Sequence, residues 1–232
     1  MRKQVDTLQQ NSEMLIVTVA QTQPGKEVLA LARIRMIIDT LRSAPGLTTS
    51  RFYRGQGSNN STYFLMTTWE DEESWLKAQE RHNPKHLLLD NREVLATPPE
   101  QWVLTYVWGY RRPLAPPTLA SAHLVTIPTR EIEQVRQNWL RELQQPDLQA
   151  LLTFGFLARG ITDTPTATRI ARPGTLINGR ELFKQASSLL LAFYSWSNEI
   201  ERSEFSMNEH YQRLEAMEEQ ANSARVLLLE AL

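Results

Sequence analysis

The spacing of hydrophobic and polar positions changes along the start of the chain from that of a strand to that of a helix. Residues 14–21 (MLIVTVAQ) form a short apolar run rich in β-branched side chains, which is typical of a buried strand. Pro24-Gly25 breaks this run. Beyond it, apolar residues recur every three or four positions, which predicts a helix with one apolar stripe: Val28, Leu31, Ile34, Ile38 and Leu41. Ala44-Pro45-Gly46 ends the helix.

Two further strands, a second helical region and a fourth strand follow. Residues 48–57 and 61–70 read as strands on either side of a turn, and the period of two places Tyr63, Leu65, Thr67 and Trp69 on one face. Residues 71–96 are predicted to be helical with a bend at Pro84. Residues 101–110 form the fourth strand, with an aromatic face of Trp102, Leu104, Tyr106, Trp108 and Tyr110. The order β-α-β-β-α-β is that of a ferredoxin-like unit.

The same order recurs after a proline-rich linker at 111–120. Four strands are expected, at 121–128, 150–160, 188–197 and 225–232. Helices are expected at 129–143 and 198–223. In the first of these, Thr129 is the expected N-cap, and the apolar stripe is Ile132, Val135, Trp139 and Leu143. The chain is therefore interpreted as two tandem units, 14–110 and 121–232.

Two tryptophans mark matching places in the units. Trp69 and Trp196 each end a third strand just before an acidic helix start, and they are 127 residues apart (196 − 69). The first strands are only about 107 apart (121 − 14), so the second unit carries about 20 more residues before its tryptophan (127 − 107). We assign them to an insertion at about 161–187, rich in Thr, Pro and Gly. Residues 1–13 are polar and are interpreted as a flexible tail.

The strands are apolar on both faces, which has a consequence for their packing. An exposed sheet face with side chains such as Phe64 and Met66 would be a large apolar patch. The simplest solution packs the antiparallel sheets of the two units face to face. We therefore expect an α+β fold of two tandem ferredoxin-like units forming an intramolecular, pseudo-dimeric barrel. Such a chain is a monomer, and further self-association is left open.

Composition removes several classes of function. The chain has 232 residues, 41% of them hydrophobic and 22% charged, as is usual for soluble globular proteins. A net charge of −1 gives no reason to expect binding to nucleic acid or to a membrane. The absence of cysteine excludes disulfides and thiolate chemistry and suits a reducing compartment, so a cytoplasmic location is expected. No apolar run approaches the roughly 18 residues of a membrane-spanning helix.

Several short motifs of the first unit resemble one family. The runs PGKE (24–27), APGL (44–47), RFYR (51–54) and Y-x-L-x-TTWEDEESW (63–75), with a histidine downstream, resemble the antibiotic biosynthesis monooxygenase family. The resemblance covers about 14–110, and the second unit resembles the family by the order of its elements and by Trp196. It implies the dimeric α+β barrel fold and a cofactor-independent monooxygenase acting on a small aromatic or apolar substrate. The alternatives are a non-enzymatic barrel that binds a small molecule or haem, and a haem-degrading monooxygenase.

A cofactor-independent oxygenase needs little more than an apolar pocket with a few polar groups. Arg51 is the candidate for stabilising an anionic oxygen, and His82 is the candidate general base. We expect both to reach a pocket between the first sheet and its helices. The candidate substrate-binding residues are Tyr53, Tyr63, Trp69, Tyr106 and Trp108. The alternative for these aromatic residues is structural: Trp69 as a repeated packing anchor and the others as inter-sheet core.

Cofactor and metal sites find less support. In the haem-degrading branch of the family, an Asn on the first strand joins a Trp and an iron-binding His, and residues 14–21 contain no Asn. No cofactor is therefore expected, and haem is kept as an alternative through His82 or His86. These two histidines have the i, i+4 spacing of metal ligands, but Pro84 lies between them and no third ligand is evident. No metal site is expected.

Overall fold

The computed structural model describes residues 13–57, 61–90, 92–113, 116–161 and 187–232. The first half runs β1 (Met14–Gln21), α1 (Glu27–Arg42), β2 (Leu47–Gly55), β3 (Thr62–Trp69), α2 (Glu72–Ala78), α3 (Pro84–Leu89), the 3-10 helix η2 (Arg92–Val94) and β4 (Glu100–Arg111). The second half runs β5 (Leu119–Pro128), α4 (Ile132–Leu143), α5 (Pro146–Ala150), β6 (Phe154–Gly160), β7 (Ser187–Trp196), α6 (Glu199–Met207), α7 (Glu209–Glu219) and β8 (Ser223–Ala231). The expected tail and almost all of the expected insertion lie outside the described residues.

The strands of the described chain close into one antiparallel barrel. Their order around the barrel is β1-β3-β2-β8-β5-β7-β6-β4. Each half supplies four neighbouring strands, and the halves meet at two seams, β2 with β8 and β4 with β6. The predicted α+β barrel within a single chain is confirmed. The predicted linker 111–120 overlaps the end of β4 at Arg111 and the first two residues of β5, and the exact unit boundaries stay predictions.

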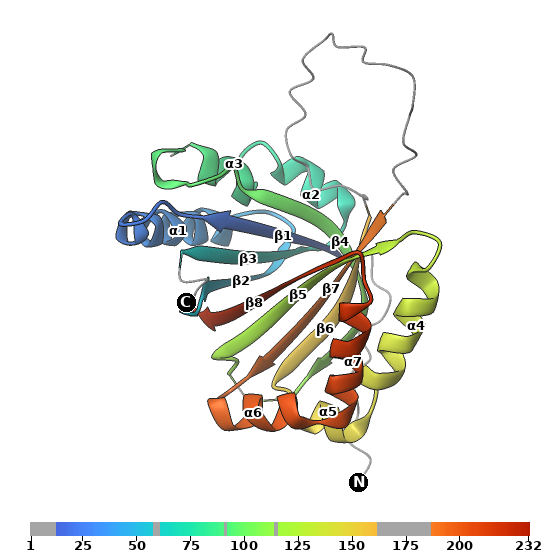
Figure 1. Ribbon diagram of the computed structural model, residues 1–232. Coiled ribbons are helices and arrows are strands. Elements are labelled where there is room, and N and C mark those ends of the chain that lie inside the picture. Colours follow the sequence, from blue (N-terminus) through green and yellow to red (C-terminus); the bar gives the residue numbers. More distant parts are fainter. Residues whose placement is uncertain (1–12, 58–60, 91, 114–115, 162–186) are drawn as a thin grey trace, which may run out of the picture.

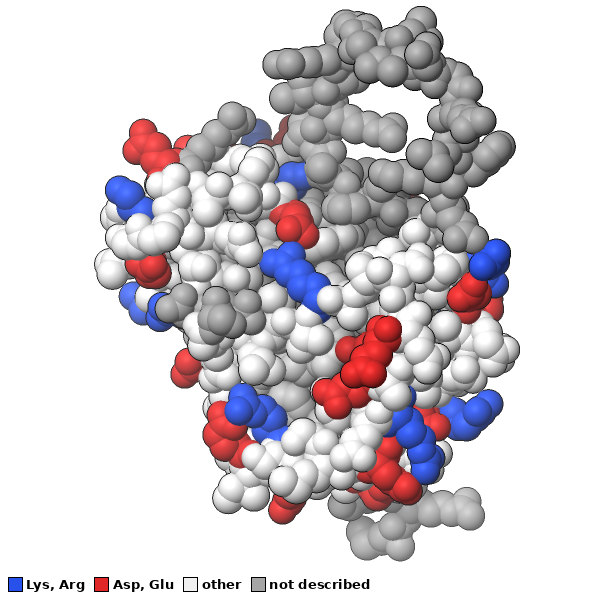
Figure 2. Space-filling view, viewed as in Figure 1, with Lys and Arg blue, Asp and Glu red and all other residues white. Residues whose placement is uncertain are grey.

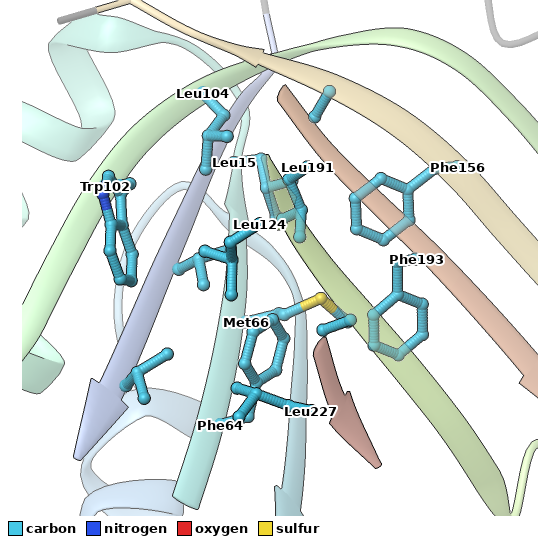
Figure 3. Close-up of a cluster of buried hydrophobic side chains, with 14 of the residues drawn as sticks. Leu15, Phe64, Met66, Trp102, Leu104, Leu124, Phe156, Leu191, Phe193 and Leu227 are labelled. Atoms are coloured by element: carbon cyan, nitrogen blue, oxygen red, sulfur yellow. The ribbon is translucent and has the colours of Figure 1, made fainter. Parts of the chain in front are cut away.

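The interior of the barrel is filled by apolar side chains from both halves. In Figure 3, labelled side chains such as Leu15 and Met66 from the first half point toward Leu191 and Phe193 from the second. Phe193 stacks on Phe64 across the two halves, with ring centroids 6.0 Å apart. Burial of each such side chain contributes about 1.5–3 kcal/mol, so this shared core holds the halves together.

The helices cover the outside of the barrel in two groups (Figure 1). Helices α1, α2 and α3 pack on the first half, and α4 to α7 pack on the second. We call the apolar side chains between each group and the sheet the first and the second outer layer. The first includes Ile34, Leu41, Tyr63, Trp69 and Trp75. The second includes Trp139, Leu143, Tyr194, Trp196, Phe205 and Leu214.

Both strand-to-helix junctions after the tryptophans are capped in the same way. The Asp71 side chain accepts a hydrogen bond from the backbone N–H of Ser74 at 2.7 Å, and Asn198 accepts one from Glu201 at 2.9 Å. Each cap satisfies a helix N–H that has no partner within the helix. The junctions that the sequence marked with Trp69 and Trp196 are therefore built alike.

Helix boundaries differ from the sequence expectation in three places. The helical region at 71–96 is divided, because the extended Asn83 caps a new helix that has Pro84 at its first turn. The predicted helix 198–223 is likewise divided at the extended Asn208. Thr129 is not an N-cap: α4 begins at Ile132, and the Thr129 hydroxyl hydrogen-bonds that of Ser188 at 3.1 Å.

The aromatic face predicted for 101–110 is correct only as far as Tyr106. A register shift in the pairing of β4 with β6 falls between Tyr106 and Trp108. The extra residue of this bulge turns the following side chains to the other face. Tyr106 therefore packs in the barrel interior, whereas Trp108 packs against the second outer layer.

The visible surface carries charges of both signs close to one another (Figure 2). Many are in short-range pairs, such as Lys77 with Glu73 on α2 and Arg202 with Glu199 on α6. None of the helices within the described residues is both long enough and apolar enough to span a membrane.

Candidate functional site

Three of the expected site residues lie on the interior face of the barrel, near the end of β3. The guanidinium carbon of Arg51 lies 4.4 Å from the ring centroid of Phe154. Tyr53, two residues along β2, is buried beneath the same face of the sheet. The hydroxyl of Tyr106 forms a 2.9 Å hydrogen bond with that of Thr68. The structure thus brings together Arg51, Tyr53 and Tyr106.

The two tyrosines of this group are held as neutral phenols. Burial raises the pKa of Tyr53, and the charge of Arg51 and a hydrogen bond from it lower that pKa in part. Burial also raises the pKa of Tyr106 to about 12, against a smaller lowering by the hydrogen bond to Thr68. A permanent cation beside two protonated hydroxyls suits an anionic oxygen atom.

Tyr63 and Trp69 lie on the other face of the same sheet, in the first outer layer. Trp69 is fully buried, packs against Trp75 at 5.5 Å between ring centroids, and donates from Nε1 to the Thr67 hydroxyl at 3.0 Å. The Tyr63 hydroxyl donates to the carbonyl of Glu27 at 3.2 Å. These contacts fit the packing interpretation of Trp69 and leave Tyr63 beside α1.

A narrow cleft opens beside Tyr63, between the sheet and helices α1 and α3. Its empty space is about 260 Å³, open solvent included. It is lined by Ala20, Thr22, Ala30, Arg33, Ile34, Tyr63, Leu88, Val94 and Leu95. The cavity itself measures only about 10 Å³, room for about one water molecule, so a ligand enters this cleft only if α1 and α3 move away from the sheet. Its wall is almost wholly apolar. The polar groups of Thr22, Arg33 and Tyr63 are hydrogen-bonded to the backbone carbonyls of Ser61, Leu87 and Glu27.

His82 is half-buried in the turn between α2 and α3 and does not line the cleft. The next residue, Asn83, belongs to a buried polar group that the sequence interpretation missed. Gln101 donates from Nε2 to Asn83 Oδ1 at 2.8 Å and to Thr18 Oγ1 at 2.9 Å. Period-two counting places Thr18 on the outer face of β1, but it gives no sign of a partner 83 residues away in the chain.

The expected residues are therefore divided among several places. Arg51 faces the interior, and the sheet separates it from Trp69, so the structure does not join Arg51, Trp69 and His82 in one pocket. Their chemical roles stay predictions. Haem also stays a prediction: neither His82 nor His86 lines the cleft. Among the residues that the structure describes, no group of three or more acidic or histidine side chains could hold a metal ion.

Comparisons with known proteins were informative for the fold. No family model matches the sequence, and neither does any curated protein. A solved structure described as an anthrone oxidase-like protein matches with a TM-score of 0.69 at 9% identity, over 96% of this chain and 92% of its own. A candidate monooxygenase from Fusobacterium nucleatum matches at 0.65 and 8% identity, over 96% and 93%.

A third structure, described as a candidate chlorite dismutase, matches with a TM-score of 0.52 at 12% identity, over 95% of both chains. These likenesses extend over both halves and the closed barrel. The chain therefore has the dimeric α+β barrel fold, and this fold fits the resemblance to the antibiotic biosynthesis monooxygenase family.

Proposed function

We propose that the chain is a cofactor-independent monooxygenase that acts on a small aromatic or apolar substrate in the cleft of the first outer layer. The observation that carries the proposal is the cleft itself. Its wall is almost wholly apolar, and Tyr63 and Arg33 are among the residues that line it. An apolar site with a few convergent polar groups is the usual form of a small-molecule site.

The chemistry that such a cleft supports is proton removal followed by reaction with dioxygen. A base takes an acidic C–H proton from the substrate, and the resulting enolate supplies the electrons that reduce dioxygen. For anthrone, one substrate and one dioxygen give one anthraquinone and one water. We assign Arg33 and Tyr63 to the enolate oxygen, for which each exchanges its present hydrogen bond, to the carbonyl of Leu87 or of Glu27, for one to the substrate. His82, in the turn before α3, is the proposed base; because it does not line the cleft, this role requires the turn to move toward the bound substrate.

The likeness to a structure described as anthrone oxidase-like supports the choice of reaction class, because it extends over nearly the whole of both chains. It also supports anthrone as the first substrate to try. The proposal assigns the site to the first half, where the family-like motifs 44–47 and 63–75 lie.

The experiment is dioxygen uptake with anthrone in the presence of a metal chelator. We expect uptake above the uncatalysed rate in the wild type, with a loss of roughly 10²- to 10⁴-fold in His82→Ala. His86→Ala is the matched control, because His86 is exposed and lies four residues further along the same region. Wild-type uptake equal to the uncatalysed rate rejects the function for this substrate class. Uptake that is unchanged in His82→Ala rejects only the base.

A further inference from the structure

The second outer layer holds a buried hydrogen-bonded chain of a serine, a histidine and a glutamate. Ser121 and His123 are two residues apart on β5, so both point toward the covering helices. The Ser121 hydroxyl lies 2.9 Å from His123 Nε2, and Glu218 Oε2, from α7, lies 2.9 Å from His123 Nδ1. Their exposed fractions are 3%, 1% and 5%, so water does not screen these contacts.

The same layer contains polar atoms that lack partners. Among the described residues, the buried side-chain nitrogen and oxygen atoms without a hydrogen bond are Trp139 Nε1, the Tyr194 hydroxyl, Trp196 Nε1 and Glu218 Oε1. Trp139, Tyr194 and Trp196 belong to the second outer layer, and Glu218 is the glutamate that bonds His123. Buried polar atoms are normally paired, so these atoms call for a partner that has polar groups of its own.

The Tyr194 hydroxyl and the free oxygen of Glu218 belong to one neighbourhood. Tyr194 pairs with Ser121 across β5 and β7, and its ring centroid lies 5.1 Å from that of His123. Burial, and after it the negative charge of Glu218, raise the pKa of Tyr194 well above its usual value. The hydroxyl therefore keeps its proton and is available as a donor beside the serine and the histidine.

The chemistry of the three groups fixes the direction of proton flow. An ionised Glu218 has only acceptor atoms, so His123 donates to it from Nδ1–H. Nε2 then accepts from the Ser121 hydroxyl, and the free lone pair of Ser121 can accept from another O–H group. This is the relation of an orienting carboxylate, a base and a hydroxyl that recurs in nucleophilic enzymes.

We propose that Ser121, His123 and Glu218 form a proton-accepting site that binds a small phenol-type ligand in the second outer layer. The ligand O–H donates to Ser121, and its oxygen accepts from the Tyr194 hydroxyl. An aromatic ligand suits the surroundings, because the rings of Tyr194, Phe205 and Tyr211 lie together, with centroids 4.7 to 6.0 Å apart. Tyr211, at 9% exposure, is the most exposed of the three rings.

The proton transfer balances within the site. The ligand proton passes to Ser121 Oγ as the serine proton passes to His123 Nε2. The products are a phenolate, hydrogen-bonded by Tyr194 and Ser121, and an imidazolium paired with the Glu218 carboxylate. The net charge is −1 before and after the step: Glu218 keeps its negative charge, and the new charge of the phenolate is balanced by that of the imidazolium. This site lies in the other half from the proposed oxygenase cleft and requires no dioxygen.

Phenol itself is the probe, and the histidine ring is the readout. The protein contains four histidines, so isotope-labelled histidine gives few NMR signals, and His123→Gln identifies the one of interest. We expect phenol to shift the His123 ring signals saturably. Ser121→Ala and Tyr194→Phe each remove one hydrogen bond to the ligand and should weaken phenol binding by roughly 2- to 12-fold.

Thr18→Val is the matched control, because it removes a buried hydroxyl from β1 in the other outer layer. It should leave the His123 titration unchanged. His123 signals that do not respond to phenol in the wild type overturn the proposal, and so does a Ser121→Ala titration that matches the wild type. The NMR titration does not depend on dioxygen uptake. A negative titration and a negative uptake experiment therefore reject different proposals.

Discussion

Thr18 and His123 occupy corresponding positions on β1 and β5. Thr18 lies four residues after Met14, which pairs with Trp69, and His123 lies four residues after Leu119, which pairs with Trp196. Both side chains are buried and hydrogen-bonded. The first half places a hydroxyl bonded to an amide at this point, and the second places an imidazole bonded to a carboxylate. The two halves thus use the same position for different polar contacts.

Gly46 should tolerate no side chain. Its φ is +77°, and an added Cβ would lie 2.5 Å from the Cβ of Ser74. Backbone strain and overlap together should lower the free energy of unfolding of Gly46→Ala by about 3–4 kcal/mol. Gly25→Ala is the control, because Gly25 has φ +79° but no atom within 4 Å of the added Cβ. Its cost should be only the strain, about 1–2 kcal/mol. Equal losses in urea unfolding would contradict the role of Ser74.

Tyr106 should make stability fall at alkaline pH. Its pKa is about 12 in the folded protein and about 10 when unfolded. Between these values the unfolded state has lost the proton and the folded state keeps it, so rising pH favours unfolding by up to about 1.4 kcal/mol per pH unit. Urea unfolding of Tyr106→Phe across this range should therefore show a shallower decline than the wild type. If burial does not raise the pKa of Tyr106, the unfolding free energies of the wild type and of Tyr106→Phe should fall equally with rising pH.

Filling the cleft should abolish substrate binding without unfolding the protein. Ala30 is buried, lines the cleft and lies on α1. In Ala30→Leu the added methylenes occupy the cleft, at a cost in stability of about 1–3 kcal/mol. Ala32→Leu, on the exposed side of the same helix, is the control. Dioxygen uptake with anthrone should be lost in the first variant only, and uptake that survives in Ala30→Leu would place the reaction elsewhere.

The two junction tryptophans should respond differently to the loss of the indole nitrogen. Trp69 Nε1 donates to the Thr67 hydroxyl, whereas Trp196 Nε1 finds no partner among the residues that the structure describes. Trp69→Phe should therefore cost about 1 kcal/mol more in unfolding free energy than Trp196→Phe. Chemical denaturation of the two variants measures the difference. A larger loss in Trp196→Phe would show that its nitrogen does have a bonding partner in solution.

Hydrophobic periodicity was sufficient for the strands and for the closed barrel. The faces of β3 are as predicted, with Tyr63, Leu65 and Trp69 in the first outer layer and Phe64 and Met66 in the interior. The stripe on α4 was also correct, since Ile132, Trp139 and Leu143 are buried. The stripe on α1 was correct for Ile34 and Leu41 but wrong for Val28, which is 81% exposed. The spacing of apolar residues could predict these results, because which face of a strand or helix is apolar depends only on the sequence of that strand or helix.

The bulge in β4 and the polar contacts could not be obtained in this way. The bulge depends on how β4 pairs with β6, which is a strand from the other half, and it moves Trp108 to another layer than Tyr106. The contact of His123 with Glu218 joins residues 95 apart in the chain. Polar contacts between residues so far apart in the sequence depend on the whole fold. The sequence around His123 therefore does not indicate that Glu218 is its partner.

Closure of the barrel by a single chain frees the halves from symmetry. In a barrel made of two identical chains, every substitution is made twice, once in each subunit, and a change that harms either copy is lost. Here each of the seams β2–β8 and β4–β6 joins two different sequences. A buried histidine bonded to a glutamate can thus arise beneath α7 while the matching position beneath α3 keeps a threonine. The single chain can evolve its two faces separately, as two unlike partners would.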